Sequence, residues 1–306
     1  MTGGNLQVAI LTGTAGSWTA AEGDSFDIAL DPSLSSLLTL TGSDFGFSFN
    51  TGPTAQTQIA DWSFTGLSDF QGVTLAADQV EVTGKTVTVT VGSSLASVSV
   101  DSFALSSKTL TDTSGITLGD SSHPAGPLTL LTLQLDGLDV SLSSLVSVTG
   151  GNLQVAILTG TAGSWTAAEG DSFDIALDPS LSSLLTLTGS DFGFSFNTGP
   201  TAQTEIADWS FTGLSDFQGV TLAADQVEVT GKTVTVTVGG SLASVSVDSF
   251  ALSSKTLTDT SGITLGDSTH PAGPLTLLTR ELVGLDVSLS SIVSVTGGNL
   301  QVAIHT

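Results

Sequence analysis

The chain contains no cysteine and no tyrosine, and only five of its 306 residues are basic. Without cysteine, disulfide bonds are excluded and the redox compartment is left open. The five bases stand against 29 acidic residues, which gives a formal net charge of -24. Nucleic acids and anionic membranes are bound by basic patches. The composition therefore predicts that neither is a partner of this protein.

Long apolar runs are also missing, although the mean hydropathy of +0.37 is high for a soluble protein. No run approaches the roughly 18 apolar residues of a membrane helix, so we expect no membrane insertion. Helical spacing of apolar residues is nearly absent, whereas strict alternation of apolar and polar residues is common. The apolar content is therefore interpreted as the core of an all-β protein.

A long internal repeat dominates the sequence. Thr2–Ile10 returns as Thr149–Ile157 and again as Thr296–Ile304, a period of 147 residues. We therefore expect copy 1 over residues 1–149, copy 2 over 150–296, and the first strand of a third copy, completing copy 2, over 297–306. The two copies differ at seven aligned positions, namely Gln58/Glu205, Ser93/Gly240, Ser122/Thr269, Leu133/Arg280, Gln134/Glu281, Asp136/Val283 and Leu145/Ile292.

One pattern, in which alternating apolar residues flank a glycine, occurs four times per period. If Gly84 and Lys85 form a two-residue loop, Val82 faces Val87 and the apolar residues of both arms share one face. Glycine at the first loop position is what a type II′ turn requires. The same register fits the pairs Gly42-Ser43, Gly137-Leu138 and Gly150-Gly151. The sequence thus predicts four tight hairpins per repeat.

Tight hairpins imply antiparallel pairing, and this decides between two architectures for a repetitive chain. We expect tandem, elongated, antiparallel β-sandwich-like repeats. The alternative is a β-solenoid, which needs coils of uniform length, whereas Gly42, Gly84, Gly137 and Gly150 are unevenly spaced.

The fourth hairpin spans the repeat boundary, so neighbouring repeats are expected to share sheet structure and to form a stiff array. The strand Leu6–Ile10 would lack its hairpin partner, which predicts head-to-tail self-association as a further partner interaction. The expected junction residues are Val146, Val148, Leu153, Val155 and Ile157 at the first boundary, and Ile292, Val295, Leu300, Val302 and Ile304 at the second.

Catalytic constellations are weak. His123 and His270 lie in turn-like segments with Ser and Asp nearby, and Asp61 and Asp69 flank Trp62 in a way that a glycosidase would use. An enzyme rarely needs two identical tandem active sites, whereas a rod, a spacer or a multivalent binder gains from each added copy. We therefore expect no enzymatic activity.

Calcium is the one cofactor that the sequence offers a reason to consider. In the hairpin register Asp136 and Asp139 oppose each other, and opposed like charges are relieved by a cation with oxygen ligands. Copy 2 has Val283 in place of Asp136, so this site is not general. A second acidic cluster consists of Glu22, Asp24, Asp27 and Asp31.

Two further features concern surfaces. Trp18 and Trp62 are candidates for stacking on sugars, although tryptophan is more often a core residue. Leu133 is replaced by Arg280 in copy 2, which a deep core would not tolerate. We expect this position to be at the surface or to touch an adjoining repeat or chain.

The chain resembles the repetitive regions of very large secreted bacterial surface proteins, of the giant adhesin or surface-fibre type. The resemblance rests on the segments Val-Thr-Gly-Gly-Asn-Leu-Gln-Val, Leu-Thr-Leu-Thr-Gly-Ser-Asp-Phe and Val-Thr-Val-Thr-Val. It implies export, tandem stacking and an extracellular or cell-surface location. The expected function is a non-enzymatic structural segment of a fibre or adhesin stalk, with a tandem carbohydrate- or surface-binding module as the alternative.

Overall fold

The computed structural model describes residues 2–29, 38–53, 59–70, 79–92, 95–118, 121–142, 145–200, 205–206, 208–217, 226–240, 242–257, 260–272, 274–290 and 292–305. Asp31, one of the predicted acidic residues, lies outside them.

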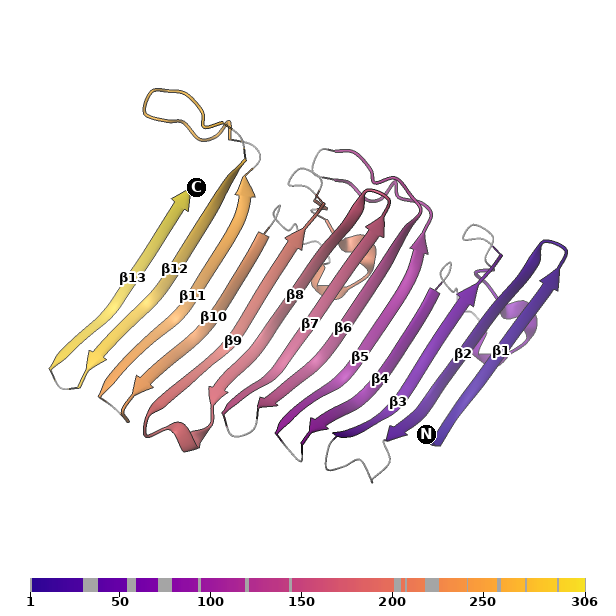
Figure 1. Ribbon diagram of the computed structural model, residues 1–306, viewed down its shortest axis with the longest axis horizontal. Coiled ribbons are helices and arrows are strands. Elements are labelled where there is room, and N and C mark those ends of the chain that lie inside the picture. The colour runs from indigo at the N-terminus through magenta and orange to yellow at the C-terminus, as the bar shows by residue number, and fades with distance from the viewer. Residues whose placement is uncertain are drawn as a thin grey trace.

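Thirteen antiparallel strands form one open sheet, and each strand is hydrogen-bonded to its neighbours in chain order (Figure 1). The prediction of an all-β chain of tandem antiparallel repeats is thereby confirmed. The strands are β1 (Thr2–Gly13), β2 (Gly16–Ala29), β3 (Leu38–Thr51), β4 (Gln79–Val91), β5 (Ala96–Leu110), β6 (Leu128–Leu142), β7 (Val146–Gly160), β8 (Gly163–Leu177), β9 (Leu185–Thr198), β10 (Gln226–Val238), β11 (Ala243–Leu257), β12 (Leu275–Leu289) and β13 (Val293–His305).

Each repeat contributes six strands to this sheet, and β1, β7 and β13 are the same strand of successive copies. Short 3-10 helices lie outside the sheet. They are η2 (Ser63–Thr65) and η3 (Ser68–Phe70) in copy 1, with η4 (Pro179–Leu181), η5 (Ser210–Thr212) and η6 (Ser215–Phe217) in copy 2.

The sandwich and the solenoid are both replaced by a single layer. All described strands belong to one sheet, so among the described residues no second sheet packs against it. A solenoid would stack parallel strands of successive coils, whereas every pairing here joins consecutive antiparallel strands. Alternation of apolar and polar residues establishes that one face of a strand is buried or apolar, but it does not say what covers that face.

The four predicted hairpin turns are wrong, because each predicted two-residue loop lies inside a long strand. Val82 pairs with Leu105 of β5, and Val87 pairs with Val100 of the same strand, so β4 runs straight through Gly84. A β-bulge adds one residue and therefore shifts the phase of apolar alternation by one, as a two-residue turn also does. The sequence pattern is the same for both structures. Actual turns lie at the strand ends, for example between β4 and β5.

The irregularities align across the sheet and form a line that we call the crease. Each is a register shift or a residue with a positive φ, which is the left-handed conformation common at bulges. Positive-φ residues along the crease in copy 1 and at the start of copy 2 include Gly3, Gly4, Ser25, Asp44, Thr86, Gly137 and Gly150.

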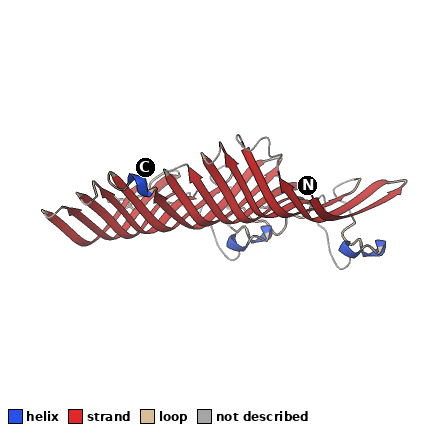
Figure 2. Cartoon of the chain, turned by 90° about the horizontal axis from the view of Figure 1, so that it is seen from below, coloured by secondary structure: helices blue, strands red, loops and turns tan. Residues whose placement is uncertain are grey.

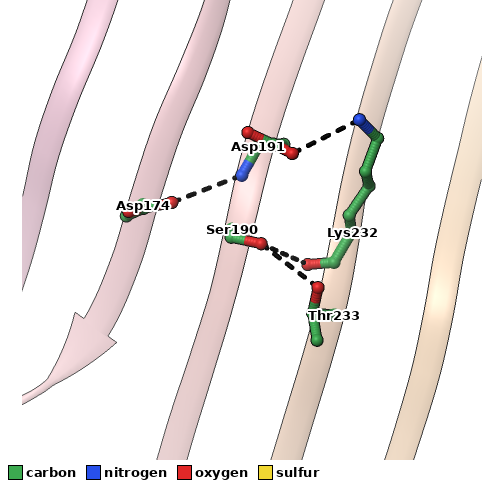
Figure 3. A network of polar contacts seen from close by, with 5 residues as sticks. All are labelled: Asp174, Ser190, Asp191, Lys232 and Thr233. Carbon is green, nitrogen blue, oxygen red and sulfur yellow. Dashed lines mark hydrogen bonds and ion pairs between the residues drawn. The ribbon is translucent and has the colours of Figure 1, made fainter.

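Polar contacts hold the crease on one side of the sheet, as Figure 3 shows for copy 2. Lys232 Nζ lies 3.3 Å from Asp191 Oδ2, and the Asp191 backbone N–H donates to Asp174 Oδ1 at 3.3 Å. The hydroxyl of Ser190 is 3.2 Å from that of Thr233. The ion pair is well exposed, so each such contact stabilises the fold by less than about 1 kcal/mol. Together they select the bent strand geometry at Asp191 and Thr233, whose φ values are positive.

The two faces of the sheet differ sharply in chemistry. One face, which we call the apolar face, carries Val80, Val82, Val87 and Val89 on β4 and their lateral partners, such as Leu105 on β5. The opposite face, the polar face, carries the alternating residues of the same strands, which are mostly Ser, Thr, Gln, Glu and Asp. Both copies repeat this division, so the sheet is amphipathic along its whole width.

The long β3–β4 and β9–β10 connections fold onto the polar face near one end of the strands. Figure 2 shows the 3-10 helices of both connections on the same side of the sheet. There they form two small clusters of buried residues, one centred on Trp62 and the other on Trp209. These clusters are the main buried cores of the described chain, and their composition differs because only the second contains residues of two repeats.

Candidate functional site: the inter-repeat junction

The two repeats are joined by a continuous strand ladder. On the copy 1 side β6 pairs with β7 through Leu131–Ile157, Leu133–Val155 and Leu135–Leu153, and β7 then pairs with β8 of copy 2. Residues 149 and 150, where the sequence copies meet, lie inside β7. The sequence boundary is therefore not a structural boundary.

The predicted junction residues lie on the two boundary strands, with one change of pairing. Val148 does not face Leu153 in a hairpin but pairs with Val140 on β6 and Ile175 on β8. The other first-boundary residues are also on β7, and Val295, Leu300, Val302 and Ile304 lie on β13 beside β12. Ile292 lies in the turn before β13 and is exposed.

Copy 1 contributes directly to the core of copy 2. From the β5–β6 connection, Ile116 and Leu118 reach across the junction, and Leu118 forms an isolated antiparallel bridge with Ile206 of the β9–β10 connection. On the sheet, Leu128 and Leu130 of β6 belong to the same cluster. The copy 2 members of this cluster are Ala156, Leu158, Trp165, Ala167, Ile206, Trp209, Leu214 and Phe217.

The sequence repeat allows each junction residue to be compared with its counterpart at a free end of the chain. Leu118 is 8% exposed, whereas the matching Leu265 near the C-terminus is 45% exposed. Leu158 is fully buried, whereas the matching Leu11 of β1 is 43% exposed. Because the side chains and local folds are the same, the adjoining repeat accounts for the difference in burial.

Buried polar groups fix the position of the connection over the sheet. Asn197 of β9 donates from Nδ2 to the carbonyl of Ile206 at 3.1 Å and accepts from Trp209 Nε1 at 3.1 Å. A buried amide that satisfies two groups in this way enforces one geometry, since each group left unpaired would cost free energy. On β7, Gln154 donates to Ser215 Oγ at 2.7 Å and accepts from the Asp216 N–H at 3.1 Å.

A group of carboxylates lies beside the junction on the polar face. Burial, reinforced by the charges of Asp216, Asp171 and Glu228, raises the pKa of Glu169 to about 7. Burial likewise raises the pKa of Asp216, with smaller contributions from Asp171 and from Asp136 of copy 1. The Oε2 atom of Glu169 and the Oδ2 atom of Asp216 are buried without a hydrogen-bond partner.

Copy 1 has the equivalent carboxylates around an open pocket. Glu22, Asp24, Asp69 and Glu81 line it together with Gly23, Gly46, Phe47, Ser48 and Thr83. Burial raises the pKa of Glu22, followed by the charges of Asp69, Asp24 and Glu81. Glu22 and Asp24 were predicted as one acidic cluster, whereas Asp69 was predicted only as a neighbour of Trp62 and Glu81 was not predicted. The three segments meet only after the strands pair and the connection folds over them.

The predicted opposition of Asp136 and Asp139 is wrong, because both lie on β6, on either side of Gly137. Asp136 accepts from Ser102 Oγ at 2.6 Å, and Asp139 accepts from the Gly150 N–H at 2.8 Å. Asp27 lies beyond the bulge that follows Asp24 in β2. Among the described residues, no group of three or more acidic or histidine side chains is arranged to hold a metal ion. Calcium binding stays a prediction from the sequence.

His123 and His270, the two histidines predicted to lie in turns, each have a structural contact. His123 Nδ1 donates to the carbonyl of Ile116 at 2.7 Å, and His270 Nδ1 does the same to Ile263 at 2.8 Å. A carbonyl only accepts, so this contact fixes the Nδ1–H tautomer. The contact closes the turn that presents Ile116 to the junction core.

The carboxylates that flank Trp62 have separate surroundings. Asp61 accepts from the Ser63 N–H at 2.8 Å, and the hydrogen bonds from Ser63 lower the pKa of Asp61. Asp69 lines the acidic pocket.

Trp62 itself is 1% exposed and belongs to the copy 1 cluster, as Trp209 does in copy 2. Trp18 is partly buried against the copy 1 cluster, whereas its counterpart Trp165 is buried in the junction core. The structure thus places the predicted sugar-stacking residues in or beside cores.

Leu133 and Arg280 occupy equivalent positions on the apolar face. Leu133 lies on β6 beside β7, and Arg280 lies on β12 beside β13. Leu133 is partly buried between Leu105 and Val155. Arg280 is exposed and pairs with Leu252 and Val302, one strand from the edge of the sheet.

The sequence predicted the boundary strands that join the repeats but missed Ile116 and Leu118, the copy 1 connection residues in the shared core. Ile116 and Leu118 lie in a Gly-Ile-Thr-Leu segment between strands. The signal that could have found them is this pair of alternating apolar residues in a connection. The sequence could not predict which residues they contact, because contact with Ile206 depends on how two connections fold over the same end of the sheet.

Comparison with family models, with curated proteins and with solved structures gives no match. In the described residues, no helix is long and apolar enough to cross a membrane.

Proposed function

We propose that this chain is a structural repeat segment that lengthens an extracellular surface fibre or adhesin stalk and performs no catalysis. The observation that carries the proposal is the shared core, in which Leu118 of copy 1 is buried against Ile206 of copy 2. Every added repeat completes the core of its neighbour and extends the same sheet. An array built in this way behaves as one stiff body, because bending at a junction would disrupt a hydrophobic cluster.

The geometry of growth supports a spacer role. Each repeat adds six strands side by side. At a strand spacing of about 4.8 Å, one repeat lengthens the assembly by about 29 Å. The extension is perpendicular to the strands, so an array of many repeats becomes a long ribbon. A fibre or stalk needs such length with little chemistry, which agrees with two nearly identical copies.

The charge distribution supports a location outside the cell. Asp and Glu outnumber Lys and Arg by 29 to 5. The resulting negative potential favours solubility of the chain. A cysteine-free, lysine-poor composition is compatible with export by a bacterium, and with the resemblance to giant surface proteins.

A tandem carbohydrate- or surface-binding module has less support. A sugar-stacking tryptophan must be exposed, whereas Trp62 and Trp209 are buried in both copies. Trp18 is partly buried against the copy 1 cluster, whereas its counterpart Trp165, which has copy 1 beside it, is buried in the junction core.

Arrays of two, three and four repeats, each ending in the β13 strand, test the proposal. Small-angle X-ray scattering should show the maximum dimension rising by about 29 Å per repeat. Calorimetry of the two-repeat chain should show one transition, with equal calorimetric and van't Hoff enthalpies. Separate transitions, or a dimension that saturates, would contradict a stiff spacer. Binding of soluble glycans at micromolar concentration would favour the alternative instead.

A further inference from the structure

In the part of the chain that the structure describes, no connection covers the apolar face of the sheet. Figure 2 shows the 3-10 helices of the β3–β4 and β9–β10 connections together on one side of the sheet, which is the polar face. Many side chains of the other side are well exposed although they are aliphatic or aromatic. Examples from both copies are Val80, Val98, Leu105, Phe194, Val227, Val245 and Leu252.

Phenylalanine and glycine make this face continuous across the crease. A Cβ atom at Gly84 would collide with the ring of Phe103, and one at Gly23 would collide with the rings of Phe47 and Phe26. The rings therefore lie flat over glycines of adjacent strands. Phe26 and Phe47 stack with their ring centroids 6.2 Å apart, and Phe173 and Phe194 repeat this in copy 2. A belt of flat rings bridges the apolar residues on either side of the crease.

Charge is nearly absent from the same face. Among described strand residues in regular pairing on the apolar face, Arg280 is the one charged side chain. It lies one strand from the edge, where an interface tolerates polar groups. The acidic residues of the strands concentrate on the polar face, as Glu22 and Glu81 illustrate. Covering the apolar face would therefore desolvate almost no charge.

The size of the face exceeds what a stable dimer requires. Thirteen strands at about 4.8 Å and about 13 residues at about 3.3 Å give a face of roughly 2,700 Å². A standard interface buries only about 800 Å² on each partner, so one third of the face is enough. Contiguous apolar patches on soluble monomers rarely exceed about 600 Å².

We propose that the apolar face is covered by the apolar face of a second copy of this chain, which gives a two-layer sandwich between chains. A two-fold axis between the layers makes the same residues meet on both sides, so one face is its own complement. The flat belt of Phe rings and the aliphatic rows fit the roughly 10 Å spacing of packed sheets. The polar faces, with their connections and carboxylates, then point outward on both sides.

Equivalent substitutions in the two copies test this pairing without touching either core cluster. Val98 and Val245 are 41% and 42% exposed on the apolar face, so V98K/V245K places a charge in the interface of each copy. The control is S97K/S244K, which adds the same charges one residue away on the polar face. Circular dichroism and thermal melting establish that both variants fold.

Analytical ultracentrifugation decides the outcome. The unaltered chain should sediment as a dimer of about twice 30.7 kDa at micromolar concentration. V98K/V245K should raise the dissociation constant at least about 100-fold, whereas S97K/S244K should leave it within about threefold. A chain that remains monomeric up to about 100 µM would overturn the proposal. Equal weakening by both variants would overturn it too, because it would indicate pairing through the sheet edges.

Flotation with vesicles of neutral phosphatidylcholine tests whether lipid, rather than a second copy of the chain, covers the apolar face. A protein dimer already covers its apolar face, so the chain should not float with the vesicles. Flotation that V98K/V245K abolishes, in a chain that is monomeric without vesicles, would assign the face to lipid and refute the pairing of two chains.

Discussion

Replacing Leu118 with alanine measures how strongly one repeat stabilises the next. Leu118 lies in the copy 1 connection, but its burial comes from Ile206 and the copy 2 cluster. Leu265 is the same residue in the same loop, with the backbone N–H bonded to Thr269 O at 2.8 Å as Leu118 N–H is bonded to Ser122 O at 2.9 Å. Of a third copy the chain contains only the first strand, in β13, and Leu265 is 45% exposed. Comparing the two substitutions therefore separates the stabilisation that comes from the adjoining repeat from the stabilisation that comes from the local loop.

The expected magnitudes follow from burial. Replacing a nearly buried leucine with alanine lowers the free energy of unfolding by about 2–3 kcal/mol, because the protein loses both transfer free energy and packing contacts. At the exposed counterpart the loss should be at most about 0.5 kcal/mol. A chain of this length shifts its melting temperature by about 2 °C per kcal/mol, so L118A should melt about 5 °C lower and L265A about 1 °C lower.

Urea denaturation followed by tryptophan fluorescence supplies the assay, because Trp165 and Trp209 lie in the junction cluster and Trp62 lies in the other. L118A should lower the midpoint of the whole transition without splitting it. Equal effects of L118A and L265A would refute the reasoning, because the local loop would then account for the entire stabilisation. A split transition in L118A with an unchanged first phase would show that the copies unfold independently.

Three further outcomes are expected. The pKa of Glu169 is raised from 4.5 to about 7, so its folded form holds the proton more tightly and its contribution to stability is lost as pH rises from about 4.5 through about 7. Allowing for its partial exposure, E169Q should stabilise the chain by about 1–2 kcal/mol at pH 8 and flatten this slope in urea titrations, and E22Q should do so less; a steeper slope would contradict this. N197L should cost about 2–4 kcal/mol, because Trp209 Nε1 and the Ile206 carbonyl lose their partner; an unchanged denaturation midpoint would exclude this role. G170A should lower the melting temperature because its Cβ would meet the ring of Phe194, whereas G266A, with open space around it, should not; equal shifts would argue against the ring packing.

Much of the fold followed from residue patterns, and the errors have a common cause. Alternation predicted the strands and the common face of Val82 and Val87 correctly. It placed a turn at Gly84 because a bulge and a two-residue turn shift the phase equally. The bulge is distinguished from a turn only by the pairing of β4 with both neighbouring strands along its full length. The β1–β7–β13 relation was visible from the repeat, whereas the position of residues 149 and 150 within one strand was not.

The sequence by itself determined the 147-residue period, the β class and the segregation of apolar residues onto one face, because each is a local or periodic property of the chain. Tertiary structure decided that the described strands form one layer and that no described residue packs over its apolar face. It also decided which residues join the repeats. Ile116 and Leu118 meet Ile206 only when connections far apart in sequence fold over the same end of the sheet. Such contacts depend on the paths of whole connections, which residue alternation does not encode.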